Sequence, residues 1–130
     1  MSKIITAKQA AELIKDNDTV AINGFVSFGH PEELTAAVES RFLETGHPQN
    51  LTLINGAGQG DGKTSFGFNH FAFEGLTKRV ICGHVGLAHK LAGLIASNKI
   101  EGYNFPQGVV THLYRAIAGK KVGVITHVGL

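Results

Sequence analysis

The feature that most constrains the fold is an apolar segment, Thr19–Asn23, that runs directly into a glycine-rich turn. The turn contains Asn23-Gly24-Phe25 and ends at Pro31, which opens an acidic, amphipathic segment. Proline is favoured at the first position of a helix, and the two glutamates that follow it favour the helix dipole. A strand, a turn and a helix in this order aim free backbone N–H groups at one point beyond the strand. The pattern therefore predicts a corner that binds an anion or a developing oxyanion.

The rest of the chain alternates between strand-like and helix-like segments. We expect strands at 19–23, 51–55, 79–82, 101–105 and 122–126, and helices at 7–15, 31–45, 69–76, 87–98 and 109–118. This alternation predicts an α/β fold with an open, mostly parallel sheet and helices on both faces, in which segment 19–23 is buried on both sides. The apolar segment 122–130 ends without a polar tail, so we expect the fold to be incomplete and the chain to be a piece of a longer polypeptide.

Four loops are predicted at the same edge of this sheet. In open parallel sheets, ligands bind beyond the carboxyl ends of the strands. The loops there are Asn23-Gly24-Phe25, Asn55-Gly56-Ala57-Gly58-Gln59, Gly83-His84 and Pro106-Gln107-Gly108. The amide of Gln107 can donate to a carbonyl or oxyanion and accept from an amine or hydroxyl, and Gly108 leaves room for close approach. Gln107 has two interpretations, a residue of the site and a turn glutamine that faces solvent, and the sequence favours them nearly equally.

Residues 57–64 resemble a phosphate-binding P-loop. This segment follows a strand and ends in Gly62-Lys63-Thr64. However, the first glycine of that motif is replaced by Ala57, and the residues after Thr64 are poor helix formers. A P-loop-like nucleotide binder is therefore the less favoured alternative. A flexible loop and a loop that lines an acyl or phosphate site both stay open.

Composition argues against several other classes of protein. The net charge is +2 with scattered basic residues, which argues against nucleic-acid binding. The single cysteine, Cys82, lies in an apolar run, which is typical of a buried thiol in a reducing compartment. Residues 1–5 lack the apolar core of a signal peptide, and no apolar stretch approaches a membrane span, so we expect a cytoplasmic protein without a membrane partner. The seven histidines do not match zinc-ligand spacings, so we expect no metal; for His84 a structural role is favoured.

Several segments, in order, together resemble the family I short-chain acyl coenzyme A-transferases of the propionate, lactate or acetate type. The likeness covers essentially the whole chain. One departure is Asn23, where the family usually has glycine. The segments that carry the resemblance are residues 5–15, the signature turn Asn23-Gly24-Phe25, Pro31-Glu32-Glu33, residues 41–46, Cys82-Gly83-His84 and residues 98–108.

The resemblance implies that residues 1–130 are the N-terminal portion of the first, alpha-type domain of a three-layer α/β sandwich of the NagB-like kind, with no second domain present. It implies ping-pong transfer of coenzyme A from a short-chain acyl-CoA to a free carboxylic acid through a glutamyl-CoA intermediate. The nucleophilic glutamate would belong to the second domain, so no residue of this chain is assigned a catalytic role. This chain would supply acyl-pocket and oxyanion-hole elements, namely Asn23, Gly24, Phe25, Asn55, Gln107 and Gly108.

The resemblance also implies the binding partners. The substrates would be an acyl-CoA and a short-chain carboxylate, with no tightly bound cofactor. The protein partners would be the remainder of the enzyme or a beta-type subunit, in a homo-oligomer, and the isolated chain would be inactive. A non-catalytic α/β module that binds a small molecule or an anion is the alternative.

Overall fold

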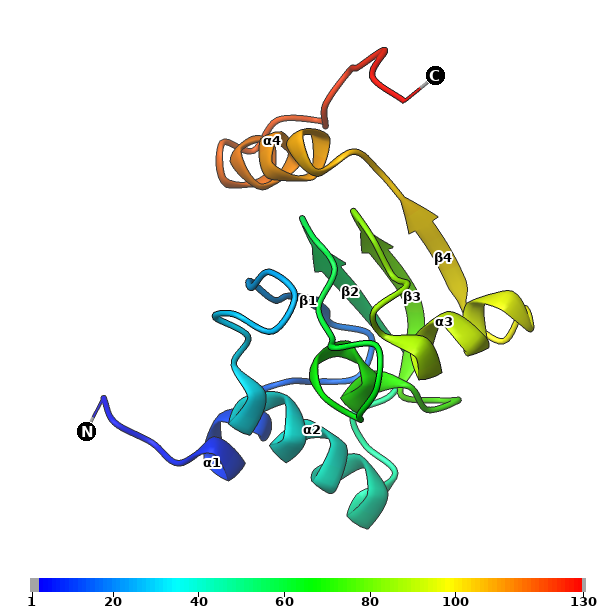
Figure 1. Ribbon diagram of the computed structural model, residues 1–130. Coiled ribbons are helices and arrows are strands. Elements are labelled where there is room, and N and C mark those ends of the chain that lie inside the picture. Colours follow the sequence, from blue (N-terminus) through cyan, green and yellow to red (C-terminus); the bar gives the residue numbers. More distant parts are fainter. Residues whose placement is uncertain (1–2, 130) are drawn as a thin grey trace.

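The computed structural model describes residues 3–129; the start of the N-terminal segment (Met1, Ser2) and the last residue of segment 122–130 lie outside the described residues. Four parallel strands form one sheet in the order β1-β2-β3-β4 (Figure 1). The expected α/β fold with an open parallel sheet is confirmed. The elements, in chain order, are α1 (Ala7–Ala11), β1 (Thr19–Ala21), α2 (Glu32–Thr45), β2 (Leu51–Asn55), the 3₁₀ helix η1 (Gly67–Phe71), β3 (Thr77–Cys82), α3 (His89–Ala96), β4 (Glu101–Asn104) and α4 (Gln107–Ala118).

Local sequence signals determine where the first two helices begin and end. Thr6 and Gln9 form a capping box at the start of α1, which ends at Ala11, earlier than expected. Helix α2 ends at Gly46, whose left-handed φ of 73° closes the helix as glycine commonly does. The expected helix 69–76 is instead the short 3₁₀ helix η1, because its phenylalanines pack inward within a single turn.

The core lies between the sheet and the elements that connect its strands. Leu51 and Leu53 of β2 and Val80 of β3 are completely buried. Phe68 and Phe71 of η1 pack against them and meet edge to face, with ring centroids 6.3 Å apart. Helix α1 packs on α2, α2 on η1, and η1 on α3, so these elements form one layer (Figure 1). Cys82 belongs to the same core, as expected.

The opposite face of the sheet is only partly covered by the described residues. On this face Ala21 and Tyr103 are exposed and Arg79 is half-buried. When neighbouring parallel strands follow one another in sequence and all their connections have the same handedness, the connections lie on one face of the sheet. Helices were expected on both faces of the sheet. In the described residues, α1, α2, η1 and α3 form a full layer on one face. The expectation that segment 19–23 is buried on both sides is wrong, because β1 is an edge strand with alternating exposure.

Helix α4 crosses the carboxyl ends of the strands, above the arrowheads in Figure 1. It begins at Gln107, two residues before the expected start. The Tyr114 hydroxyl donates a hydrogen bond to the carbonyl of Ile54 at the end of β2 (3.2 Å). This contact places the second half of α4 over the end of β2, and a Cβ on Gly56 would lie 3.8 Å from Gln107 Cγ at the start of the helix.

The expected strand 122–126 is not formed. Residues 122–126 have no regular structure, and Val122 and Ile125 are exposed. A strand needs a neighbour to accept its backbone hydrogen bonds, and this segment follows α4 instead of lying beside β4. Its apolar pattern alone was not sufficient to add it to the sheet.

Candidate functional site

The loops predicted at the carboxyl edge of the sheet converge on one small cavity. Its volume is about 180 Å³. It lies between the signature turn, the glycine loop after β2 (residues 56–67), the end of β3 and the start of α4. Its lining residues are Phe25, Val26, Gly56, Ala57, Gly58, Gly83, His84, Leu87 and Gln107.

The signature turn is tied to the glycine loop by backbone hydrogen bonds. The Val26 N–H donates to the carbonyl of Gly58 (2.8 Å), and the Gly60 N–H donates to the carbonyl of Val26 (3.1 Å). Gly24 has a φ of 144°, and a Cβ there would lie 3.0 Å from both Gln59 Nε2 and His30 N. Only glycine fits at this position, so the turn is held close against Gln59.

Gln107 and Gly108 lie at the start of α4 but face different hollows. Gln107 is exposed and lines the small cavity, and its side chain makes no hydrogen bond among residues 3–129. Gly108 borders a larger hollow of about 720 Å³ between α4 and residues 121–128. That hollow is walled by the irregular segment after α4, away from the strand ends, so the smaller cavity is the better candidate site. A Cβ on Gly108 would meet nothing within 4 Å.

The two asparagines predicted for the site do not line the cavity. Asn55 is buried at 1% exposure; its amide N–H donates to the carbonyl of Ile22, and its carbonyl oxygen accepts from the N–H of Ala57. It therefore joins the end of β1 to the glycine loop. Asn23 is exposed and borders a separate hollow beside α1 and α2.

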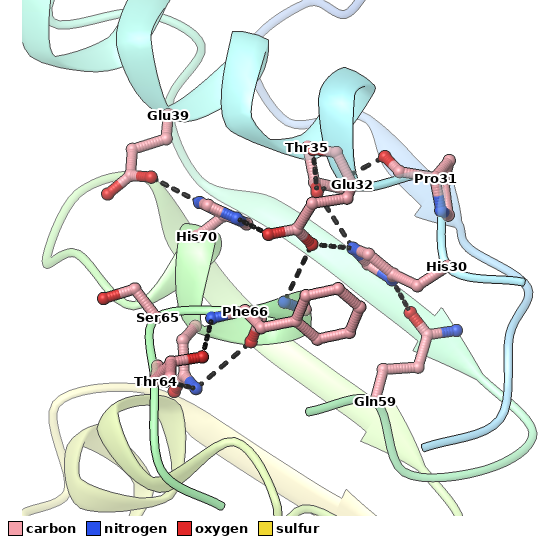
Figure 2. A network of polar contacts seen from close by, with 12 residues as sticks. His30, Pro31, Glu32, Thr35, Glu39, Gln59, Thr64, Ser65, Phe66 and His70 are labelled. Carbon is pink, nitrogen blue, oxygen red and sulfur yellow. Dashed lines mark hydrogen bonds and ion pairs between the residues drawn. The ribbon is translucent and has the colours of Figure 1, made fainter. Parts of the chain in front are cut away.

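A polar network behind the signature turn was not foreseen from the sequence (Figure 2). The Gln59 amide N–H donates to the carbonyl of Ile22 (3.1 Å), which leaves its oxygen to accept from His30 Nδ1. His30 Nε2 lies 2.9 Å from Thr35 Oγ1 and 3.5 Å from a Glu32 oxygen. Burial lowers the pKa of His30, although the hydrogen bond to Gln59 opposes the shift. A neutral ring with its proton on Nδ1 fits this geometry.

His70 extends this network along the same face of α2. Its Nε2 lies 2.7 Å from a Glu32 oxygen, and its Nδ1 contacts a carboxylate oxygen of Glu39 (Figure 2). Burial by itself would lower the pKa of His70, but hydrogen bonds to Glu32 and Glu39 outweigh it and raise the pKa. Glu32 also accepts a hydrogen bond from the N–H of Gly67 (3.1 Å). The network thus fixes α2, η1 and the signature turn relative to one another.

His84 and Gln59 were only weakly indicated by the sequence pattern. His84 lines the cavity at the end of β3, as its place after a strand suggested, whereas the structural hydrogen bond favoured for its side chain is absent among residues 3–129. Gln59 lies within the glycine loop and is 1% exposed. Only the folded loop shows that it supports Gly24.

The P-loop alternative is wrong. The backbone N–H groups of Lys63 and Thr64, which a phosphate would need, donate to Asp61 Oδ1 (2.9 and 2.8 Å), and the Thr64 hydroxyl donates to Asp61 Oδ2 (2.7 Å). These bonds lower the pKa of Asp61 to about 2, with the Thr64 hydroxyl as the largest cause. A carboxylate therefore occupies the anion position, and no α-helix starts at Thr64.

Two further observations concern the described part of the chain. Among residues 3–129, no group of three or more histidine, cysteine, aspartate or glutamate side chains is placed to hold a metal ion. None of the described helices is both long and apolar enough to span a bilayer.

Comparisons with known proteins place the chain among coenzyme A transferases. The model of the family described as coenzyme A transferase matches residues 4–130. The chain is 42% identical over 130 residues to the caffeate CoA-transferase of Acetobacterium woodii, covering 100% of this chain and 25% of that protein. It is 26% identical over 132 residues to the acetate CoA-transferase subunit alpha of Escherichia coli K12, covering 99% of this chain and 55% of that subunit.

The fold matches as well. A solved structure of the acyl-CoA transferase YdiF from Escherichia coli O157:H7, as a thioester complex with CoA, superposes with a TM-score of 0.88. The sequences are 33% identical, and the match covers 97% of this chain and 26% of that one. This chain thus spans about a quarter of the length of the caffeate CoA-transferase and of the YdiF chain.

Proposed function

This chain belongs to the coenzyme A transferase family, and we propose that residues 1–130 are the N-terminal portion of the first, alpha-type domain of an enzyme that transfers coenzyme A from a short-chain acyl-CoA to a free carboxylic acid. The observation that carries the proposal is the cavity of about 180 Å³ at the carboxyl edge of the sheet, where Phe25 and Gln107 meet glycine-rich backbone. Pockets at this edge are the usual ligand sites of open α/β sheets.

In the proposed reaction a glutamate outside this chain attacks the acyl-CoA thioester carbonyl, and the CoA thiolate leaves. The thiolate then attacks the glutamyl carbonyl of the resulting anhydride, which releases the first acid and leaves a glutamyl-CoA thioester. A second carboxylate repeats the sequence in reverse and departs as its CoA thioester. In each step a carbonyl oxygen gains negative charge.

The residues of this chain stabilise the negative charge on those oxygens and contact the acyl group. The free amide N–H of Gln107 donates to the developing oxyanion, where one such donor contributes several kcal/mol of barrier reduction, about 3 to 4. Phe25, Val26 and Leu87 form the apolar wall against the acyl chain. Gly24 and Asn55 shape the turn and the glycine loop, and Asn23 and Gly108 stay proposed members of the site through the family resemblance.

The family also supports proposals about partners and location. The partner is the remainder of the polypeptide or a beta-type subunit that carries the glutamate, in a homo-oligomer, and the substrates are an acyl-CoA and a short-chain carboxylate without a tightly bound cofactor. We place the protein in the cytoplasm, because its single cysteine is buried and unpaired. A non-catalytic α/β module that binds a small molecule or an anion is the alternative, and its ligand would occupy the same cavity.

The test begins with the native polypeptide purified from its source. Its denatured mass shows whether the polypeptide exceeds 13.8 kDa, and its CoA transfer from acetyl-CoA to propionate is then assayed. We expect Gln107→Ala to lower kcat by about 100-fold or more. Gln49→Ala is the matched control, because Gln49 is exposed and its side chain only donates to the carbonyl of Gly46. A Gln107→Ala enzyme with wild-type turnover would remove Gln107 from the site. A native polypeptide that binds carboxylates without transferring CoA would favour the alternative.

A further inference from the structure

The cavity contains a second polar side chain, His84, to which the proposed reaction assigns no role. We propose that His84 binds the carboxylate of the free acid that accepts coenzyme A, as a donor beside Gln107. This inference rests on the proposed function and names the group that recognises its second substrate.

The backbone of Gly58 and of Gly86 lies close to the imidazole ring of His84, an exposed residue at the end of β3. A Cβ on Gly58 would lie 3.0 Å from His84 Cδ2, and a Cβ on Gly86 would lie 2.8 Å from His84 Cε1. Glycine at both positions leaves the ring room beside the backbone, at the wall of the cavity that it lines.

The ring nitrogens of His84 are unused. Among residues 3–129, neither accepts nor donates a hydrogen bond, although the side chain lines the cavity. By contrast, His30 and His70 of the polar network behind the signature turn have partners on both nitrogens. An imidazole at a cavity wall with both nitrogens free is suited to bind a ligand.

The chemistry of the lining selects a carboxylate. Of the lining side chains, only His84 and Gln107 are polar, none is acidic, and His84 alone can carry a positive charge. A carboxylate that enters an apolar cavity loses hydration at two oxygens, so it needs two donors, and a charged donor forms the stronger bond. A thioester presents one neutral carbonyl oxygen, for which Gln107 suffices. His84 therefore acts on the acid rather than on the acyl-CoA.

Two variants of the native polypeptide test this role. His84→Phe keeps a planar ring between Gly58 and Gly86 but removes both nitrogens, and His84→Gln restores one N–H donor without charge. With acetyl-CoA as donor and propionate as acceptor, we expect His84→Phe to raise the KM for propionate about 10- to 100-fold. His84→Gln should recover part of this loss. The KM for acetyl-CoA and the formation of the enzyme–CoA thioester, followed by intact mass, should change less than about threefold.

The matched control is His89→Phe, at the exposed start of α3 outside the cavity, which should leave both KM values unchanged. An equal rise of both KM values in His84→Phe, or an unchanged KM for propionate, would overturn the role of His84. If His84→Phe melts at a lower temperature than wild type, the comparison is made with His84→Gln alone, whose KM for propionate must still rise selectively.

Failure of the proposed function is a separate outcome. If the wild-type polypeptide transfers no CoA to any carboxylate, calorimetric titration with propionate tests His84 directly. Propionate affinity that falls at least 10-fold in His84→Phe but not in His89→Phe supports a carboxylate site at His84. Equal affinity in wild type and both variants refutes it.

Discussion

Replacement of Glu39 by glutamine should weaken the attachment of α2 to η1, and the effect should depend on pH. Both nitrogens of His70 face carboxylate oxygens, one of Glu39 and one of Glu32, and the His70 side chain is 10% exposed. A neutral imidazole has only one N–H, so two such bonds require the protonated ring. Glutamine keeps an oxygen that accepts from Nδ1 but removes the charge of residue 39.

The magnitude follows from that loss of charge. A hydrogen bond to a charged group contributes about 1.5 to 3 kcal/mol and a neutral one about 0.5 to 1.5 kcal/mol, so the change should cost about 1 kcal/mol of local stability. The Glu39 side chain is 23% exposed, so screening by solvent is modest.

The pH dependence has a definite sign. The folded state raises the pKa of His70, so the stabilisation is complete below the ordinary histidine value of about 6.5 and fades as pH rises through the folded pKa. The cost of Glu39→Gln should therefore be about 1 kcal/mol at pH 6 and clearly smaller at pH 9. His30, which also faces Glu32 and whose pKa is lowered, contributes equally to both proteins and cancels in the comparison.

Amide hydrogen exchange of the segment 67–71, measured in the native polypeptide, reports this local free energy. Glu33→Gln is the control, because it makes the same charge change in the first turn of α2 at an exposed position outside the network. An equal loss of protection at pH 6 and pH 9, or an equal loss in Glu33→Gln, would refute the protonated bridge.

Three further predictions concern the core and the loops. Phe68→Ala should destabilise the protein by about 3 to 5 kcal/mol, because Phe68 is 1% exposed and packs edge to face on Phe71; a change below about 1 kcal/mol in chemical unfolding would contradict this packing. Asn55→Ala should cost about 1 to 3 kcal/mol, because it leaves the buried N–H of Ala57 unpaired, and faster exchange of that amide should accompany the loss; unchanged exchange would count against the bond. Asp61 has a pKa of about 2, so the amide signal of Thr64 in a titration followed by NMR should stay constant from pH 8 to about 4 and shift only towards about 2; a shift centred near 4 would show that Asp61 does not hold the loop.

Much of the secondary structure followed from local chemistry. The helix start at Ala7, the helix end at Thr45 and the strand Leu51–Asn55 depend on local patterns and not on distant residues, and each lies where it was predicted. The wrong predictions concerned features that depend on tertiary contacts. Segment 122–126 has the apolar pattern of a strand but lacks a neighbouring strand with which to pair.

The candidate site was predicted in outline. Parallel strands end at one edge of their sheet, so the loops after β2, β3 and β4 could be expected to converge there. Which side chains face the cavity could not be predicted. Asn55 ends β2 and His84 follows β3, yet the carboxamide of Asn55 is bound to backbone whereas His84 lines the cavity.

Periodicity, turn residues and motifs are local properties of the chain, so they were sufficient to predict the α/β class, the edge of the sheet at which a site forms and the resemblance to the coenzyme A transferases. Only the folded protein shows that Gln59 and His30 support Gly24, and that His84 lines the cavity beside Gln107 without a side-chain hydrogen bond among residues 3–129. These outcomes depend on hydrogen bonds and close contacts between residues far apart in the chain, and only the folded backbone brings such residues within reach.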